Sequence, residues 1–180
     1  MTLAGRARRL VAAAAAAVAL AGCATMNVNS FVARGVDFTQ FKSYAWGPEE
    51  QFATGDPRLD NNPFFQERVQ AGADRLLAAR GFEKVTSGTP DLVLHYHASV
   101  RQRLDVSGAD EKYGYCEDCS VEVFDAGTLT LDFVDPRTNR LIWRGWAERS
   151  LDGLIDNQEL FEQQIDRAVE RIIEKLPPTL

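Results

Sequence analysis

The sequence predicts a small α+β domain: an antiparallel sheet of about four strands, with two amphipathic helices packed on one face. Apolar residues recur at helical spacing in residues 63–80 and again in 160–176. They alternate with polar residues in other stretches, most clearly in 91–104 and 121–134. Two helices that each carry one apolar stripe are accommodated most economically on a single face of such a sheet.

Residues 1–22 have the pattern of a secretory signal peptide. Arg6, Arg8 and Arg9 form a basic start, and the apolar run Leu10–Ala21 that follows is shorter than the roughly 20 residues that span a bilayer. The run closes with Leu20-Ala21-Gly22-Cys23, which resembles the lipobox of bacterial lipoproteins. We therefore expect cleavage before Cys23. A chance cysteine behind an ordinary signal peptide is the alternative.

Lipid attachment to Cys23 would make the membrane a partner of this chain. A diacylglycerol thioether on the thiol, with a further acyl chain such as palmitate on the α-amine, gives stable anchoring, since each buried methylene contributes about 0.8 kcal/mol. The next residue is Ala24, not the Asp that retains Gram-negative lipoproteins in the inner membrane. This implies an outer membrane lipoprotein of the cell envelope that faces the periplasm.

The remaining 158 residues suit one domain, predicted at 31–180 behind a lipidated tether at 23–30. The chain has 20 basic and 26 acidic residues; three arginines lie in the signal peptide, so the mature part is strongly acidic. That balance argues against nucleic acid as a partner.

The elements of the domain are expected in the order strand, helix, three antiparallel strands, helix. Asn62 is the predicted N-cap of the first helix, with Pro63 at its first position and Gly81 beyond its end. Asp156 and Glu159 form a capping-box pattern before the second helix. The predicted strands are 32–46, 82–85, 91–104, 121–134 and 140–150.

Several stretches together resemble the domain-of-unknown-function 4136 family, small bacterial lipoproteins with one such domain. They are Asp37-Phe38, Phe41–Trp46, Arg80–Phe82, Pro90–Val93, Gly127–Leu129, Asp132–Asp135 and Leu141–Ala147. The resemblance implies a periplasm-facing lipoprotein domain. It implies no activity and carries over no catalytic residue. Cys116 and Cys119 depart from the family pattern, where aromatic residues and glycine are commoner.

His95 and His97 are weak candidates for a metal site. At positions i and i+2 of a strand they share a face, so both rings could meet one ion. Zinc needs a third or fourth ligand, and nearby in sequence only Asp91 and Asp105 offer one. The favoured interpretation is two half-exposed histidines on the wetter face of a strand.

Cys116 and Cys119 form a CxxC pair, for which we expect a disulfide because the envelope is oxidising. Redox catalysis is disfavoured, since the pair ends a loop and encloses two acids, which raise the pKa of a thiol. If Arg103 pairs near Ser120, then His97 lies opposite residue 126, about 24 Å along the sheet from Cys119. We therefore predict no zinc site that joins the histidines to the cysteines.

Trp143 and Trp146 could line a ligand groove together with Tyr44 and Trp46, although aromatics at strand positions more often belong to the core. Three residues apart, the two tryptophans point to opposite faces of a regular strand, unless Gly145 marks a bulge.

Common catalytic motifs are missing from the sequence, among them G-x-S-x-G, the P-loop and H-E-x-x-H. We therefore expect no enzyme and no cofactor, but a binding or structural lipoprotein whose partner is the membrane and an envelope protein. The alternative is a metal-dependent or redox activity that uses His95, His97, Cys116 and Cys119.

Overall fold

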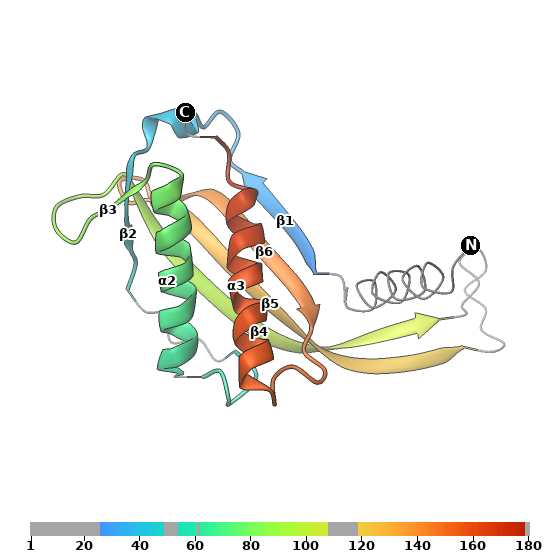
Figure 1. Cartoon of the computed structure of the whole chain (residues 1–180). Helices are drawn as coiled ribbons and strands as arrows, with labels where there is room; N and C mark the ends of the chain where they lie inside the picture. Colours follow the sequence, from blue (N-terminus) through green and yellow to red (C-terminus); the bar gives the residue numbers. More distant parts are fainter. Residues whose placement is uncertain (1–25, 49–53, 61, 108–118, 179–180) are drawn as a thin grey trace, which may run out of the picture.

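The computed structural model describes residues 26–48, 54–60, 62–107 and 119–178. One sheet forms the back of the molecule, and two helices lie side by side over one of its faces (Figure 1). The helices are α2 (Pro63–Ala79) and α3 (Gln158–Glu174). A short 3-10 turn, η1 (Phe38–Gln40), precedes the second strand.

The sheet has six strands in the order β1-β6-β5-β4-β2-β3. Antiparallel pairing joins β1 to β6, β6 to β5 and β5 to β4, whereas β2 runs parallel to both β4 and β3. The strands are β1 (Asn27–Val32), β2 (Ser43–Trp46), β3 (Glu83–Lys84), β4 (Leu92–Ser107), β5 (Ser120–Asp135) and β6 (Arg140–Ser150).

The prediction of an antiparallel sheet of about four strands is therefore wrong, although the α+β class is compatible with the structure. The stretch 32–46, expected as one strand, contains only the last residue of β1 and all of β2, with η1 and its flanking turns between them. β1 lies at one edge beside β6, and β2 lies beyond β4. The helix α2 follows β2 and carries the chain back along the sheet, so β3 and β4 run parallel to β2. The sheet is therefore mixed.

The predicted boundaries of the first helix are confirmed. The Asn62 side chain accepts a hydrogen bond from the Phe65 backbone N–H at 3.2 Å, and Pro63 occupies the first turn. Gly81 ends the helix with φ +85°, a backbone conformation that favours glycine. The buried face of α2 consists of Phe65, Val69, Gly72, Ala73 and Leu77.

The start of the last helix differs from the predicted capping box by one residue. Asn157, not Asp156, is the N-cap, and its side chain accepts from the Leu160 backbone N–H at 3.1 Å. Asp156 instead accepts a hydrogen bond from the Arg58 guanidinium at 2.6 Å.

Replacing the cap of α2 tests how much this hydrogen bond stabilises the fold. We expect Asn62→Ala to lower the free energy of unfolding by about 1 kcal/mol, because the Phe65 N–H loses its acceptor. Asn62→Asp keeps an acceptor there and should stay close to wild type in the same urea titration. A loss as large in the Asp variant as in the Ala variant would contradict this role of the side chain.

The core lies between the helices and the covered face of the sheet. Aromatic rings dominate its centre: Phe133 stacks on Phe82 with 5.7 Å between ring centroids and meets Trp143 at 5.9 Å. The two helices are also joined outside the core, since Arg68 of α2 forms ion pairs of 2.6 and 2.7 Å with Glu162 and Asp166 of α3.

The hairpin β4–β5 is much longer than the rest of the sheet, and its far part projects from the body (Figure 1). Arg103 pairs with Phe124, not near Ser120, and His97 pairs with Thr130 instead of residue 126. The ladder continues to Ser107 and Ser120, so the predicted register is wrong by four residues. The predicted strand ended at Leu104, because the polar residues beyond it indicated a loop.

Candidate functional site

The face of the sheet that the helices leave open carries polar side chains in its middle. His97 of β4, Asp132 of β5 and Arg144 of β6 form what we call the polar cluster. The turn at Pro136–Asn139, where Asn139 has φ +53°, joins β5 to β6 and places Asp132 directly opposite Arg144. Its three side chains therefore come from three adjacent strands.

Asp132 is the centre of this cluster. Its carboxylate accepts from Arg144 Nε at 2.7 Å and from Arg144 Nη2 at 2.5 Å, and His97 Nε2 lies 3.5 Å away. The side chain of Asp132 is only 5% exposed, whereas that of Arg144 is 46% exposed. A charged carboxylate in such a place requires partners that compensate for its lost hydration.

The pKa of Asp132 reflects two opposing effects. Burial favours the neutral acid and works to raise the pKa, while hydrogen bonds and charge from Arg144 and His97 favour the carboxylate. The second effect is larger, so the pKa of Asp132 is lowered from its ordinary value of 3.8. The pair therefore stays ionised at neutral pH, and the exposed part of Arg144 remains available to a polar partner.

The two predicted histidines lie on this same face of β4, but their rings contact different residues. The His97 ring approaches Asp132, whereas the His95 ring packs against Gly47, where an added Cβ would lie 2.2 Å from His95 Cε1. Gly47 is therefore required beside the His95 ring.

The two acids considered as further metal ligands lie elsewhere. The Asp91 carboxylate accepts hydrogen bonds of 2.9 Å from the backbone N–H groups of Lys42 and Ser43, which fixes the start of β2. Asp105 lies in the projecting part of β4, opposite Glu122. Within the described part of the chain, no three His, Cys, Asp or Glu side chains gather as a metal site would require.

Of the three cysteines, Cys23 and Cys116 lie outside the described residues, and Cys119 lies within them. Cys119 is disulfide-bonded. The pairing with Cys116 stays a prediction. His97 lies opposite Thr130, which is eleven residues from Cys119 along β5, so the register separates them further than the sequence analysis expected.

The tryptophans of β6 do not line one groove. Trp143 is 1% exposed under the helices, and Trp146 is half-buried on the other face, in register with Thr130. Gly145 does not form a bulge. The register between β5 and β6 shifts instead after Phe133: Phe133 pairs with Trp143 and Val134 pairs with Leu141, so the pairing passes over Ile142. A Cβ at Gly145 would lie 2.5 Å from Trp143 Cζ2, so this glycine makes room for the indole ring.

Tyr44 and Trp46, the other two residues of the proposed groove, are tied to α2. The Tyr44 hydroxyl and Trp46 Nε1 donate to the same Asp74 oxygen at 2.6 and 2.8 Å, and Lys84 donates to the other oxygen at 2.7 Å. These bonds dock β2 and β3 against the helix. They give the two aromatic side chains a structural role.

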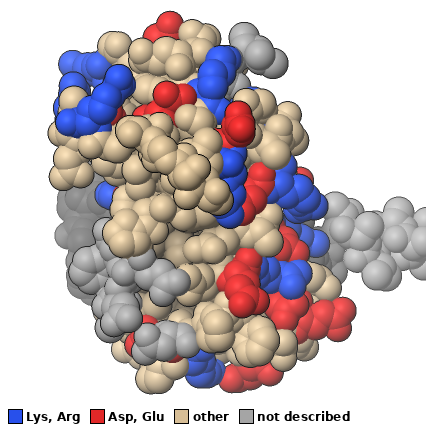
Figure 2. All heavy atoms as spheres, turned by 90° about the vertical axis from the view of Figure 1, so that its left-hand side faces the viewer, with Lys and Arg blue, Asp and Glu red and all other residues tan. Residues whose placement is uncertain are grey.

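Two open hollows beside α2 and α3, both lined in part by Phe64 and Arg68, have volumes of about 560 and 340 Å³, whereas the apolar cavity on the helix side is much smaller. An apolar cavity of about 60 Å³ lies between α3 and the sheet, with Phe65, Leu129 and Ile165 among its walls. Ligand pockets have volumes of roughly 300–1,000 Å³, so this cavity does not fit a metabolite. On the side seen in Figure 2, acidic and basic side chains are interspersed and form no continuous field of one sign.

Sequence reasoning missed the polar cluster, although a signal for it was present. The predicted turn at Pro136–Asn139 implies a tight hairpin, and a tight hairpin places Asp132 close to Arg144 across the ladder. Asp132 also stands out as an acid between Leu131 and Phe133 in an apolar strand. The His97 contact needed the register of β4 on β5, which the sequence analysis misjudged.

Three solved structures resemble this fold. A PDZ domain protein from Parabacteroides distasonis aligns over 87% of this chain with a TM-score of 0.55 and 14% identity, and the chain spans 37% of that protein. The PelC dodecamer from Paraburkholderia phytofirmans aligns over 84% of this chain and 98% of its own, with a TM-score of 0.47 and 14% identity.

A neuraminyllactose-binding hemagglutinin homologue from Helicobacter pylori aligns over 76% of this chain and 86% of its own, with a TM-score of 0.46 and 16% identity. At these identities the likeness concerns the fold alone. No curated protein matches the chain at a significant level.

The helices of the described chain are either too short or too polar to cross a bilayer. The family resemblance seen in the sequence is confirmed by a family model, Domain of unknown function (DUF4136), that matches residues 28–178. The match covers every described helix and all but the first residue of the sheet. The chain therefore belongs to the DUF4136 family.

Proposed function

We propose that this chain is a lipoprotein of the bacterial cell envelope, anchored through Cys23 to the periplasmic side of the outer membrane, and that its domain is a non-enzymatic binding or structural module. The observation that carries the proposal is the sequence Leu20-Ala21-Gly22-Cys23 behind a basic start and a short apolar run. Those three features have the order and spacing that lipoprotein processing requires.

The position of β1 supports a domain held close to a membrane. β1 begins at Asn27, four residues after Cys23, so the connection is shorter than the predicted tether of residues 23–30. The Met26 carbonyl also accepts a hydrogen bond of 3.0 Å from Arg171 of α3, which fixes the chain just before the strand. With Cys23 in a membrane, the domain would lie directly on its surface.

The polar cluster supports a binding role on the open face of the sheet. Arg144 keeps about half of its side chain exposed while Asp132 holds its guanidinium in a fixed orientation. Trp146 lies half-buried on the same face of β6, two residues further along. An oriented guanidinium near an indole is a combination that protein interfaces favour, so the proposed partner is an envelope protein.

Replacing the lipidated cysteine tests the anchor. We expect Cys23→Ser to abolish incorporation of labelled palmitate and to release the protein from the membrane fraction, because no thioether can form on a hydroxyl. The matched control is Cys119→Ser, which removes a different cysteine and should keep label and fractionation. A Cys23→Ser protein that is still labelled and sediments with membranes would refute the proposed anchoring.

A further inference from the structure

The projecting part of the β4–β5 hairpin, residues 101–107 with 120–125, is called the arm here. Two cross-strand pairs of aliphatic residues, Leu104 with Val123 and Val106 with Val121, lie on one face of the arm. We call these four residues the arm patch. Their exposed fractions are 69%, 58%, 48% and 58% in that order, so the body of the domain leaves them open to solvent.

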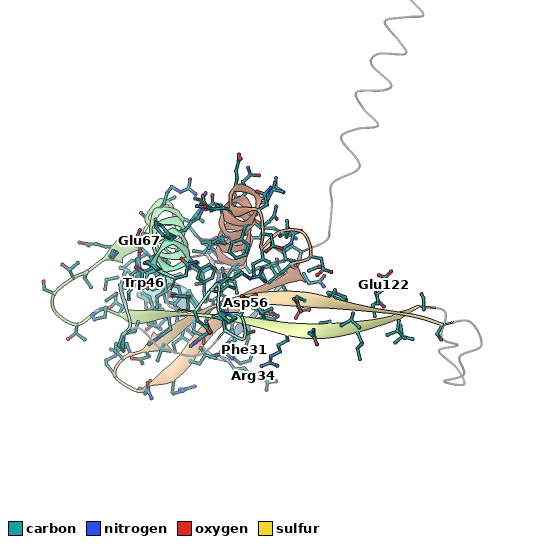
Figure 3. All side chains as sticks on the ribbon, turned by 90° about the horizontal axis from the view of Figure 1, so that it is seen from below. Phe31, Arg34, Trp46, Asp56, Glu67 and Glu122 are labelled. Atoms are coloured by element: carbon teal, nitrogen blue, oxygen red, sulfur yellow. The ribbon has the colours of Figure 1, made fainter. Side chains whose placement is uncertain are left out.

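The opposite face of the arm is charged. Asp105 pairs across the ladder with Glu122 and therefore lies on the face opposite to the arm patch. Glu122 stands on the arm well outside the body (Figure 3). The outer part of the arm is therefore amphipathic; nearer the body, Gln102 and Asp125 lie on the face of the arm patch and Phe124 on the other face. An exposed aliphatic surface of this kind marks a site of contact with a partner or a membrane.

The start of β1, four residues after the predicted anchor Cys23, lies toward the same end of the sheet as the arm. Asn27 pairs with Glu148, and Glu148 pairs with Thr128, so the start of β1 is level with Thr128 of β5. Because β1 runs antiparallel to β6 and β6 antiparallel to β5, the N-terminal end of β1 points toward the end of the sheet from which the arm projects. Figure 1 shows the start of β1 and the arm on the same side of the body.

Chain lengths bring the arm patch and Cys23 within reach of one surface. From the level of Asn27, the four residues back to Cys23 span at most about 14 Å at roughly 3.4 Å per residue. Val123 and Val121 lie five and seven residues beyond Thr128, or about 17 and 24 Å along β5 at the same rise. The patch thus lies at least as far out from the body as Cys23 can reach, so a membrane that holds the lipid can also meet the aliphatic face of the arm.

We propose that the arm patch inserts into the interfacial layer of the bilayer that carries the lipid on Cys23. This inference rests on the proposed function, since the lipid brings the arm to the membrane. Four aliphatic side chains bind a bilayer weakly alone, but a covalent anchor on the same surface makes the contact intramolecular. The domain is then held at two points, the lipid and the arm patch. This fixes the orientation of the open face of the sheet relative to the membrane.

Charge on the arm argues for insertion by apolar burial. Arg101 and Arg103 are outnumbered by the three acids Asp105, Glu122 and Asp125, so the arm carries no basic cluster for anionic lipids. Arg103 is moreover paired with Glu148 at 2.5 Å. The contact should therefore be no stronger on phosphatidylglycerol than on phosphatidylcholine vesicles, and added salt should not weaken it.

The test places a fluorescent reporter on each face of the arm in the lipidated protein. In a Cys116→Ser/Cys119→Ser background, Val121→Cys and Glu122→Cys give neighbouring single thiols that point to opposite faces, and each is labelled with the environment-sensitive dye NBD. Both proteins are reconstituted in phosphatidylcholine vesicles, with or without a nitroxide on the acyl chains near the glycerol. We expect a blue-shifted emission, quenched by the nitroxide, at position 121 and water-like, unquenched emission at position 122.

The outcomes separate this inference from the proposed anchoring. Protein that does not float with vesicles and whose N-terminal peptide lacks the lipid mass refutes the anchor. Protein that floats, with equal and water-like emission at both positions, overturns only the arm contact. A blue shift at position 121 that nitroxide lipids do not quench, and that fades as protein is diluted in the vesicles, would mean that a second copy covers the patch, which also overturns the proposal.

Discussion

Leu131→Ala is expected to lower the free energy of unfolding by about 2–5 kcal/mol, the range for a large-to-small change in a core that cannot collapse. Leu131 is fully buried and lies in the middle of β5, between Tyr96 of β4 and Gly145 of β6. Strands on both sides prevent the backbone from closing the space left by the lost side chain. Urea titration at neutral pH, followed by far-UV circular dichroism, measures the change.

Thr130→Ala is the matched control, one residue away on the other face of β5. Thr130 is only half-buried, so its truncation removes little apolar contact and opens no cavity. We expect its effect to be well below that of Leu131→Ala. Equal losses in the two variants would show that the assignment of the two faces of β5 is wrong.

The sequence predicted those parts of the fold in which the pattern is local. Both helices were found from apolar spacing, and the ends of α2 followed from Asn62, Pro63 and Gly81. Side-chain alternation gave the correct faces for the middle of β4 and β5, because every second residue there is apolar and is also buried under the helices. In the arm the alternation continues but the burial does not, so alternation alone did not reveal that Leu104, Val121 and Val123 are exposed.

The topology could not be predicted in the same way, because strand order depends on contacts between distant segments. β1 and β2 are separated by only ten residues but lie at different places in the sheet, with β6, β5 and β4 between them. The pairings of β2 with β3 and with β4 depend on the crossover through α2, and hydrophobic periodicity carries no information about such a crossover. Local signals for a turn were present at Gly35, whose φ is +76°, but a turn does not say which strand the next segment joins.

The candidate site shows the same division between local and distant information. His95 and His97 were found as a pair because their spacing is visible in the sequence, yet their partners come from other elements: Gly47 beside His95 and Asp132 beside His97. A buried acid in an apolar strand was the stronger signal. It requires a cation across the ladder, and Arg144 meets that need through a hairpin whose turn the sequence predicts.

Removing the carboxylate from the polar cluster should be the most costly change on the open face. We expect Asp132→Ala to lower the free energy of unfolding by about 2–3 kcal/mol, near the lower end for breaking a buried ion pair, because Arg144 can still reach solvent. The exposed ion pair between Arg103 and Glu148 supplies a control, since Glu148→Ala should cost no more than about 1 kcal/mol. Comparable losses at both sites would contradict the special role of burial at Asp132.

The contribution of Asp132 should also disappear in acid. Its pKa is lowered in the folded protein, so its stabilising effect is fully present above the ordinary pKa of 3.8 and is lost as the pH falls through the lower, folded-state value. The comparison is made in a His97→Gln background, which removes the neighbouring imidazole and its own protonation. There we expect the proteins with Asp132 and with Asp132→Asn to differ by a constant free energy from pH 7 to about pH 5, and the difference to shrink below about pH 4. Urea titrations across this range measure it. A difference that persists or grows as the pH falls below 4 in that background would show that the Asp132 carboxylate is not stabilised by Arg144.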